Sequence, residues 1–181
     1  MRNETRPGTQ HSEPQLQLKE ADIIQIIIDD HKALKELIEV MKDSDRETAV
    51  RFGAFTEFAT TLTAHAKPEE EVLYADMKNE TELRKEAFEG DVEHHVADQL
   101  VEKIKRTSDE DLKLARIKVL AEIVERHIEE EEGDLLPKFR KHSSTQVRAE
   151  LGNRFLERKL KYLSSGSDQA TPSSKTPPAK H

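Results

Sequence analysis

The chain has 181 residues, of which 34% are hydrophobic and 36% charged, and its formal net charge is −8. The acidic charge argues against a nucleic-acid partner, and no apolar run is long enough to span a bilayer. The absence of cysteine excludes disulfides, iron–sulfur clusters and thiol catalysis. Helix-forming residues dominate while Gly and Pro are few, which favours an all-α fold.

The two ends differ in composition from the body of the chain. Residues 1–17 are polar, with Pro7 and Pro14, and are predicted to be a disordered N-terminal segment. This segment contains no apolar signal-peptide core, so we expect a cytoplasmic protein. The Ser/Pro-rich tail 164–181 is also predicted to be disordered. Residues 18–163 are predicted to form one domain.

Five helices are predicted in the body, the first four as an up-down-up-down four-helix bundle and the last as a short additional C-terminal helix. Their expected ranges, in chain order, are 19–43, 46–78, 80–106, 110–141 and 144–163. Asp109 is expected to cap the fourth helix. Pro68 lies inside the second helix, where it removes a backbone hydrogen bond and is expected to kink the helix.

The first four helices each carry an apolar stripe at steps of three or four residues, typical of a side that faces a core. Each stripe contains one histidine near its middle, and two contain a glutamate one turn later. The stripes are Ile27, His31, Leu34, Ile38 and Met41; Phe55, Phe58, Leu62, His65, Glu69 and Val72; Ala87, His94, Ala97, Val101 and Ile104; and Ile117, Leu120, Val124, His127, Glu131 and Leu135.

The polar residues of these stripes have the chemistry of metal ligands. His65 and Glu69 are four residues apart, as are His127 and Glu131, so each pair projects from one helix face. Imidazole nitrogens with carboxylate oxygens suit iron or manganese better than zinc, and a carboxylate has two oxygens with which to bridge two metals. The predicted metal ligands are His31, His65, Glu69, His94, His127 and Glu131.

The spacing of each pair is weak support on its own, because a chain so rich in glutamate produces such pairs by chance. A lone buried histidine is more often a hydrogen-bonded core residue, and acidic runs such as 69–71 and 129–132 are usually solvated. We therefore expect the other carboxylates of these runs to face solvent. Six such side chains in the middle of four stripes are stronger support, because unpaired buried carboxylates cost several kcal/mol.

Two further residues have open assignments. His95 replaces His94 as the inward side chain if the third helix is rotated, although the stripe favours His94. Tyr74, five residues after Glu69, is either a core side chain or a phenol beside the metals.

The pattern resembles the hemerythrin-like (HHE cation-binding) domain family over roughly residues 20–141, including the strings HAKPEEEVLY, EHHVADQL and RHIEEEEGDLLPKF. The resemblance implies a four-helix bundle with two iron ions, bridged by Glu69, Glu131 and an oxo or hydroxo group. It also implies reversible binding of O2, or related chemistry with O2, peroxide or nitric oxide. In the family's pattern His31 matches the single ligand of the first helix, and His94 matches the first histidine of the third.

Two positions depart from the oxygen carriers of that family. The carriers have HxxxH in the third helix, where this chain has Asp98 four residues after His94. They have HxxxxD in the fourth helix, where this chain has HxxxE. One iron is therefore expected to lack a histidine, with Asp98, Tyr74, water or an exogenous ligand in its place. The departures favour oxidase, peroxidase-like or catalase-like activity, or sensing, over stable O2 carriage.

Two alternatives remain at this stage. A ferritin-like ferroxidase needs Glu-x-x-His on two helices, and the chain offers only Asp91-x-x-His94. A metal-free helical interaction module would use the same histidines as packed core residues.

Overall fold

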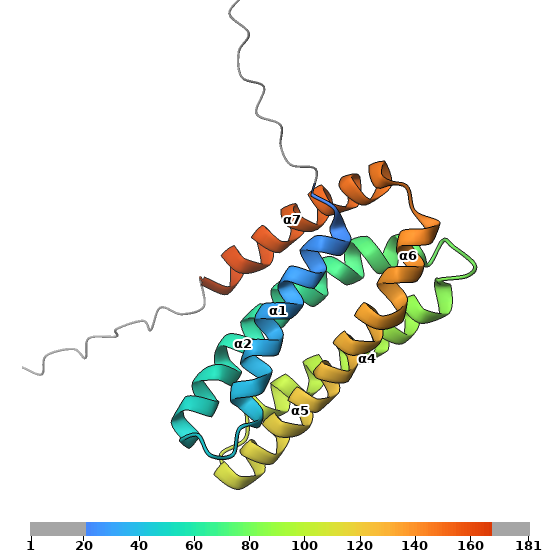
Figure 1. The fold of residues 1–181 in the computed structure, drawn as a ribbon. Coiled ribbons are helices and arrows are strands. Elements are labelled where there is room, and N and C mark those ends of the chain that lie inside the picture. The colour runs from blue at the N-terminus through green and yellow to red at the C-terminus, as the bar shows by residue number, and fades with distance from the viewer. Residues whose placement is uncertain (1–20, 168–181) are drawn as a thin grey trace, which may run out of the picture.

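The computed structural model describes residues 21–167, and all regular secondary structure in that range is helical, which confirms the all-α prediction (Figure 1). In chain order the elements are α1 (Ile23–Lys42), α2 (Thr48–Glu69), the π-helix η1 (Glu70–Tyr74), α3 (Ala75–Met77), α4 (Arg84–Lys105), α5 (Glu110–Glu130), the π-helix η2 (Glu131–Leu135), α6 (Leu136–His142) and α7 (Thr145–Ser167). None of these helices in residues 21–167 is long and apolar enough to cross a membrane.

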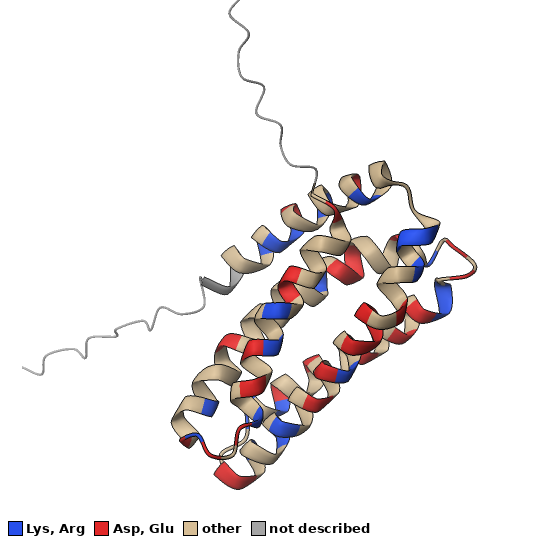
Figure 2. Cartoon of the chain, viewed as in Figure 1, with Lys and Arg blue, Asp and Glu red and all other residues tan. Residues whose placement is uncertain are grey.

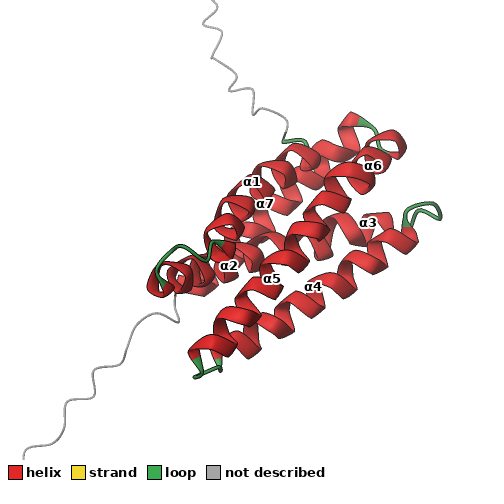
Figure 3. Ribbon diagram, turned by 60° about the horizontal axis from the view of Figure 1, so that its bottom comes forward, coloured by secondary structure: helices red, strands yellow, loops and turns green. Residues whose placement is uncertain are grey.

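The elements before α7 make four long helices, because α2, η1 and α3 follow one another without a loop, as do α5, η2 and α6. α1 packs against α2 and α5, and α4 packs against α5 and α2. Loops 43–47 and 106–109 lie at one end of the molecule and loop 78–83 at the other (Figures 1 and 3). The second and fourth long helices follow the predicted ranges closely.

Capping side chains fix where two of the helices begin. Asp109 caps α5 as predicted, accepting a hydrogen bond from the backbone N–H of Leu112 at 2.8 Å. Asp22 caps α1 in the same way, so α1 begins at Ile23 and not at the predicted residue 19. α4 begins at Arg84 and not at residue 80, because residues 78–83 form the turn that leads into it.

Two apolar clusters fill the bundle, one on each side of its middle. All residues of the four predicted stripes are buried, and each stripe passes from one cluster to the other through its histidine or glutamate. The first cluster includes Leu34, Leu62, Ala97 and Val124. The second cluster includes Ile27, Val72, Ala87 and Leu135. The polar residues of the stripes thus lie between two apolar layers that exclude water.

The fifth helix is longer than predicted. α7 spans 23 residues and continues to Ser167, past the predicted end at 163. It packs along α1 and α2 (Figure 1). Gly152 permits a close approach at the start of α1, because a Cβ at this position would lie 1.6 Å from the carbonyl oxygen of Ala21. The N-terminal segment 1–17 and residues 168–181 of the predicted tail lie outside the described residues.

Candidate metal centre

The six predicted ligands lie together in the middle of the bundle, although they come from all four long helices. They are His31 on α1, His65 and Glu69 on α2, His94 on α4, His127 on α5 and Glu131 at the start of η2. Each of these residues is between 0% and 5% exposed. The helical stripes therefore place six polar side chains in one buried region of the interior.

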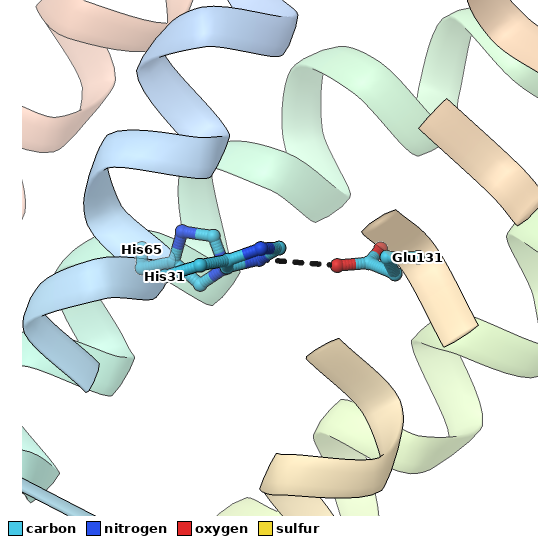
Figure 4. A group of neighbouring side chains, drawn as sticks. All are labelled: His31, His65 and Glu131. Atoms are coloured by element: carbon cyan, nitrogen blue, oxygen red, sulfur yellow. Dashed lines mark ion pairs between the residues drawn. The ribbon is translucent and has the colours of Figure 1, made fainter. Parts of the chain in front are cut away.

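These residues form two groups of three, each with two histidines and one glutamate. The first group is His31, His65 and Glu131, and the second is Glu69, His94 and His127. Within each group the nearest ligand atoms lie within 4.8 Å of one another, close enough for one metal ion. Figure 4 shows the first group, in which Glu131 reaches across the bundle toward the two histidines. Each group thus offers the mixed nitrogen and oxygen donors that suit iron or manganese.

Both glutamates face the two groups at once. Glu131 Oε2 lies 3.3 Å from Nε2 of His31 and 3.5 Å from Nε2 of His127. Glu69 Oε2 lies 3.2 Å from Nε2 of His65 and 3.8 Å from Nε2 of His94. Each carboxylate therefore stands between one histidine of the first group and one of the second.

Several of these buried atoms have no hydrogen-bond partner among the described residues. They are Nε2 of His31, Nε2 of His65, both carboxylate oxygens of Glu69 and Oε2 of Glu131. A buried carboxylate without hydrogen bonds costs several kcal/mol, and a bound cation removes that cost. Nε2 of His94 and Nε2 of His127 converge as well, at 3.0 Å. The residues present therefore fit a pair of metal ions.

A ring of four further carboxylates faces the outer nitrogens of the four histidines. We call Asp30, Glu70, Glu93 and Glu132 the carboxylate ring. The Nδ1–carboxylate pairs are His31 with Glu132 at 3.0 Å, His65 with Asp30 at 3.5 Å, His94 with Glu70 at 3.3 Å and His127 with Glu93 at 2.7 Å. A carboxylate on Nδ1 fixes the orientation of an imidazole and leaves its Nε2 lone pair for a metal.

The carboxylate ring was missed by the sequence analysis. Glu70 and Glu132 belong to acidic runs that were expected to face solvent, but both are half-buried against a histidine. Each member of the ring is the chain neighbour of a predicted ligand, yet it supports a histidine on a different long helix. These residues could have been found from the sequence because each is adjacent to a predicted ligand. Which histidine each carboxylate contacts depends on how the helices pack.

The carboxylates shift the pKa of the metal-free centre. Burial opposes protonation of His65, but the charges of Glu69 and Asp30 outweigh it and raise the pKa of this imidazole to about 10. Burial disfavours ionised Glu131, yet the facing His127 and the contact with His31 keep the pKa of its carboxyl below the ordinary value. At neutral pH the metal-free centre therefore keeps a proton on His65, which a metal must displace.

A family model for the hemerythrin HHE cation-binding domain matches residues 22–139, a range that contains all six predicted ligands and most of the chain. The chain belongs to this hemerythrin family. The resemblance inferred from the sequence is thereby confirmed. Searches among curated proteins and solved structures gave no match.

Tyr74 occupies a position in this hemerythrin-like centre that the sequence left open. Its side chain is fully buried, its hydroxyl donates a hydrogen bond to Glu131 Oε1, and its ring stacks on His94 at 5.4 Å. Gly90 leaves the necessary space, because a Cβ there would lie 2.6 Å from the Tyr74 ring. Burial and the charges of Glu131 and Glu69 raise the pKa of the phenol well above its ordinary value, so the hydroxyl keeps its proton.

The π-helices explain how Tyr74 reaches the centre. A π-helix closes its turn with i→i+5 bonds, so side chains five residues apart face the same side. Tyr74 follows Glu69 by five residues, and η1 begins directly after Glu69. Pro68, which was expected to kink the second long helix, lies two residues before η1. The other π-helix, η2, begins at Glu131, so each glutamate of the centre marks the start of a π-helical turn.

The structure brings neither His95 nor Asp98 to the six residues. His95 is exposed and hydrogen-bonded to Gln99 at 2.8 Å. Asp98 forms an ion pair with Lys67 at 2.6 Å. Each group of the centre contains two histidines. The expectation that one iron lacks a histidine found in the oxygen carriers stays a prediction, and the ion pair with Lys67 turns Asp98 away from the role of substitute ligand.

A cavity of about 220 Å³ on the side of α4 and α5 reaches one residue of each group. It reaches His127 and Glu131 at its inner end, and Gly90 forms part of its wall. Five further carboxylates line it: Glu86, Glu89, Glu93, Glu130 and Asp134. Figure 2 shows acidic residues in red along these helices. The cavity therefore joins an acidic surface of α4 and α5 to His127 and Glu131 of the centre.

Proposed function

We propose that this hemerythrin-family protein is a non-haem di-iron protein that binds or reacts with O2 or a related small oxidant such as peroxide or nitric oxide. One observation carries the proposal: two equivalent groups of ligand atoms share two glutamates, and several of those atoms are buried without a hydrogen-bond partner among residues 21–167. A lone structural cation would account for only one of the two groups.

In this proposal His31 and His65 hold one iron, and His94 and His127 hold the other. Glu69 and Glu131 lie between them as bridges. Bound iron would supply redox chemistry and coordination positions for a small oxidant. The proposal takes the four long helices as an up-down-up-down bundle, which the alternating loop positions support.

The chain's own residues would control protons and water around the centre. The Tyr74 hydroxyl holds a proton against Glu131 Oε1, where it fixes that oxygen and leaves Oε2 facing the histidines. The apolar clusters above and below keep bulk water out. The acidic cavity beside His127 and Glu131 has a volume of about 220 Å³, which exceeds that of a diatomic molecule or peroxide. These features suit oxidase, peroxidase-like or catalase-like chemistry, or sensing, in the cytoplasm.

The two alternatives have less support. For a ferritin-like ferroxidase, Asp91 would have to reach the centre with His94, but its carboxylate is paired with Lys78. For a metal-free module, Glu69 would be buried without hydrogen bonds among residues 21–167, and the charge of protonated His65 would offset only part of that cost.

Iron counting with matched histidine variants tests the proposal. Protein loaded anaerobically with Fe(II) should bind two irons per chain, and His94→Ala should lose at least one. His95→Ala, an adjacent exposed histidine on the same helix, should still bind two. Fewer than one iron per chain in the unchanged protein, with no recovery on further loading, would overturn the proposal.

The absorption spectrum of the iron-loaded protein then separates a carrier from an enzyme or sensor. Bands that appear in air and vanish when O2 is removed would indicate carriage. Bands that persist would indicate oxidation of the iron, as expected for a catalytic or sensing role.

A further inference from the structure

α7 covers the first group of the metal centre from outside the hemerythrin domain. The family model ends at residue 139, before α7 begins at Thr145. Phe155 on α7 is fully buried and its ring lies 6.3 Å from that of His65, in an edge-to-face arrangement. A helix that the family match does not include therefore contacts one of the predicted ligands.

A chain of polar contacts leads from α7 to the same histidine. Lys159 on α7 forms an ion pair with Oδ1 of Asp30. The other oxygen of Asp30 faces Nδ1 of His65 at 3.5 Å. Asp30 is thus held between a lysine on one side and an imidazole on the other.

Each member of the carboxylate ring has such a cation. Glu132 pairs with Lys35 at 2.7 Å, Glu70 with Lys67 at 3.0 Å and Glu93 with Arg126 at 3.8 Å. These three cations belong to the long helices that also carry His31, His65 and His127. Asp30 alone in the ring takes its cation from α7. The ion pair of Asp30, the fourth member of the carboxylate ring, therefore forms only when α7 is in place.

We propose that Lys159 is a positioning residue for the metal held by His31 and His65, and that it acts through Asp30. This inference rests on the proposed di-iron function. A carboxylate that supports a metal-bound histidine typically changes metal affinity by about 10- to 100-fold when it is removed. Lys159 fixes the carboxylate of Asp30 and balances its charge, so that Asp30 can hold the imidazole of His65 at the metal. The C-terminal helix thereby tunes one metal and not the other.

Other contacts anchor α7 without Lys159. Arg148 bonds Asp22 at 2.8 Å near the start of the helix, and Arg158 pairs with Glu71 at 3.2 Å. Loss of the Lys159 ammonium group should therefore leave α7 docked. Arg158 is also a matched control, because it is the chain neighbour of Lys159 and pairs with a carboxylate outside the carboxylate ring.

The test measures release of Fe(II) from anaerobically loaded full-length protein to an excess of chelator. Lys159→Met should accelerate release of one iron per chain about tenfold, and Asp30→Asn should accelerate the same phase by about 10- to 100-fold. Lys159→Arg should restore the slow phase, and Arg158→Met should leave both phases unchanged. The Mössbauer spectrum of ⁵⁷Fe should show one altered iron site in Lys159→Met.

The double variant tests the route of the effect. If Lys159 acts through Asp30, adding Lys159→Met to Asp30→Asn should change the release rate no further. Equal acceleration by Lys159→Met and Arg158→Met would overturn the inference, as would unchanged release in Lys159→Met from a protein that holds two irons. Fewer than one iron per chain in the unchanged protein would instead overturn the proposed function.

Discussion

The two groups of the metal centre have the same donors but different surroundings. The first group, His31, His65 and Glu131, lies on the side that α7 covers with Phe155 and Lys159. The second group is Glu69, His94 and His127, and its His127, together with Glu131 of the first group, lines an acidic cavity between α4 and α5. Under the proposed function, equal ligands in unequal surroundings predict that the covered side retains its metal and that the open side admits cations and small molecules.

Removal of Phe155 should have the largest effect on stability. Phe155→Ala deletes a fully buried ring of the covered side and should lower the free energy of unfolding by about 3–5 kcal/mol. Phe88→Ala removes a 45% exposed ring of α4 on the open side and should cost less, about 1–2 kcal/mol, because the ring contacts the cations of Lys78 and Arg84. Urea denaturation of the metal-free proteins measures both. Similar losses in the two variants would contradict the contrast between the sides.

A methyl group at Gly90 should disturb the open side by displacing Tyr74. Its Cβ would lie 2.6 Å from the phenol ring, so Gly90→Ala should cost about 1–3 kcal/mol through overpacking. Gly53→Ala is the control, because this exposed glycine inside α2 has nothing within 4 Å of its Cβ position and should gain about 1 kcal/mol. Thermal unfolding compares the two variants. Unchanged thermal stability of Gly90→Ala would show that the position of Tyr74 is not fixed by close packing.

The protonation of His65 should make the metal-free protein less stable at high pH. The pKa of His65 is raised from 6.5 to about 10 in the folded state. The contribution of this group to the free energy of unfolding is therefore complete below pH 6.5 and is lost as the pH rises through about 10. Between these values the folded state binds one proton more than the unfolded state. The free energy of unfolding should then fall by about 1.4 kcal/mol per pH unit from this group.

Denaturant titrations between pH 7 and pH 9.5 check this slope. His65→Gln should make the slope shallower by about one proton. The pKa of His127 is also raised, because the charges of Glu131 and Glu93 outweigh the effect of burial. His127→Gln, on the open side, should therefore also make the slope shallower. A flat pH profile of the unchanged metal-free protein would contradict the charge arrangement of the centre.

The sequence predicted the parts of this molecule that follow from local periodicity. Heptad-like stripes placed His31 and Glu131 in the interior, and adjacent residues of one helix cannot both face inward, so the stripe favoured His94 over His95. The partner of Asp30 depends on how two helices pack, and its cation comes from α7, which lies far along the chain. The sequence predicted α7 as a helix, but not which part of the bundle it covers.

The change from α-helix to π-helix could not be predicted from the pattern of apolar residues either. The π-helix η1 brings Tyr74 to the side of Glu69, whereas an α-helical register puts a residue five positions later off that face. The reason for Gly90 became visible only with Tyr74 beside it, because a glycine inside a helix is otherwise unfavourable. Long-range partners, not composition, thus account for what the sequence analysis missed.

The smallest expected effect concerns the charge of the cavity. Glu130 is an exposed carboxylate at its edge, so Glu130→Gln should change stability by less than about 0.5 kcal/mol. One charge acting on a divalent cation about 10 Å away in water contributes about 0.8 kcal/mol, so Fe(II) uptake should slow by up to about fourfold at low salt. Asp29→Asn on α1 is a similar exposed carboxylate near the covered side and should leave uptake unchanged.

Stopped-flow measurement of Fe(II) uptake by the metal-free protein compares these two variants. The difference between them should shrink in about 1 M salt, where exposed charges are screened beyond about 3 Å. If Asp29→Asn slows uptake as much as Glu130→Gln, iron does not arrive preferentially through the α4/α5 cavity. In that case the open side would admit the small oxidant alone, and the covered side would have to open, with α7, for iron to bind.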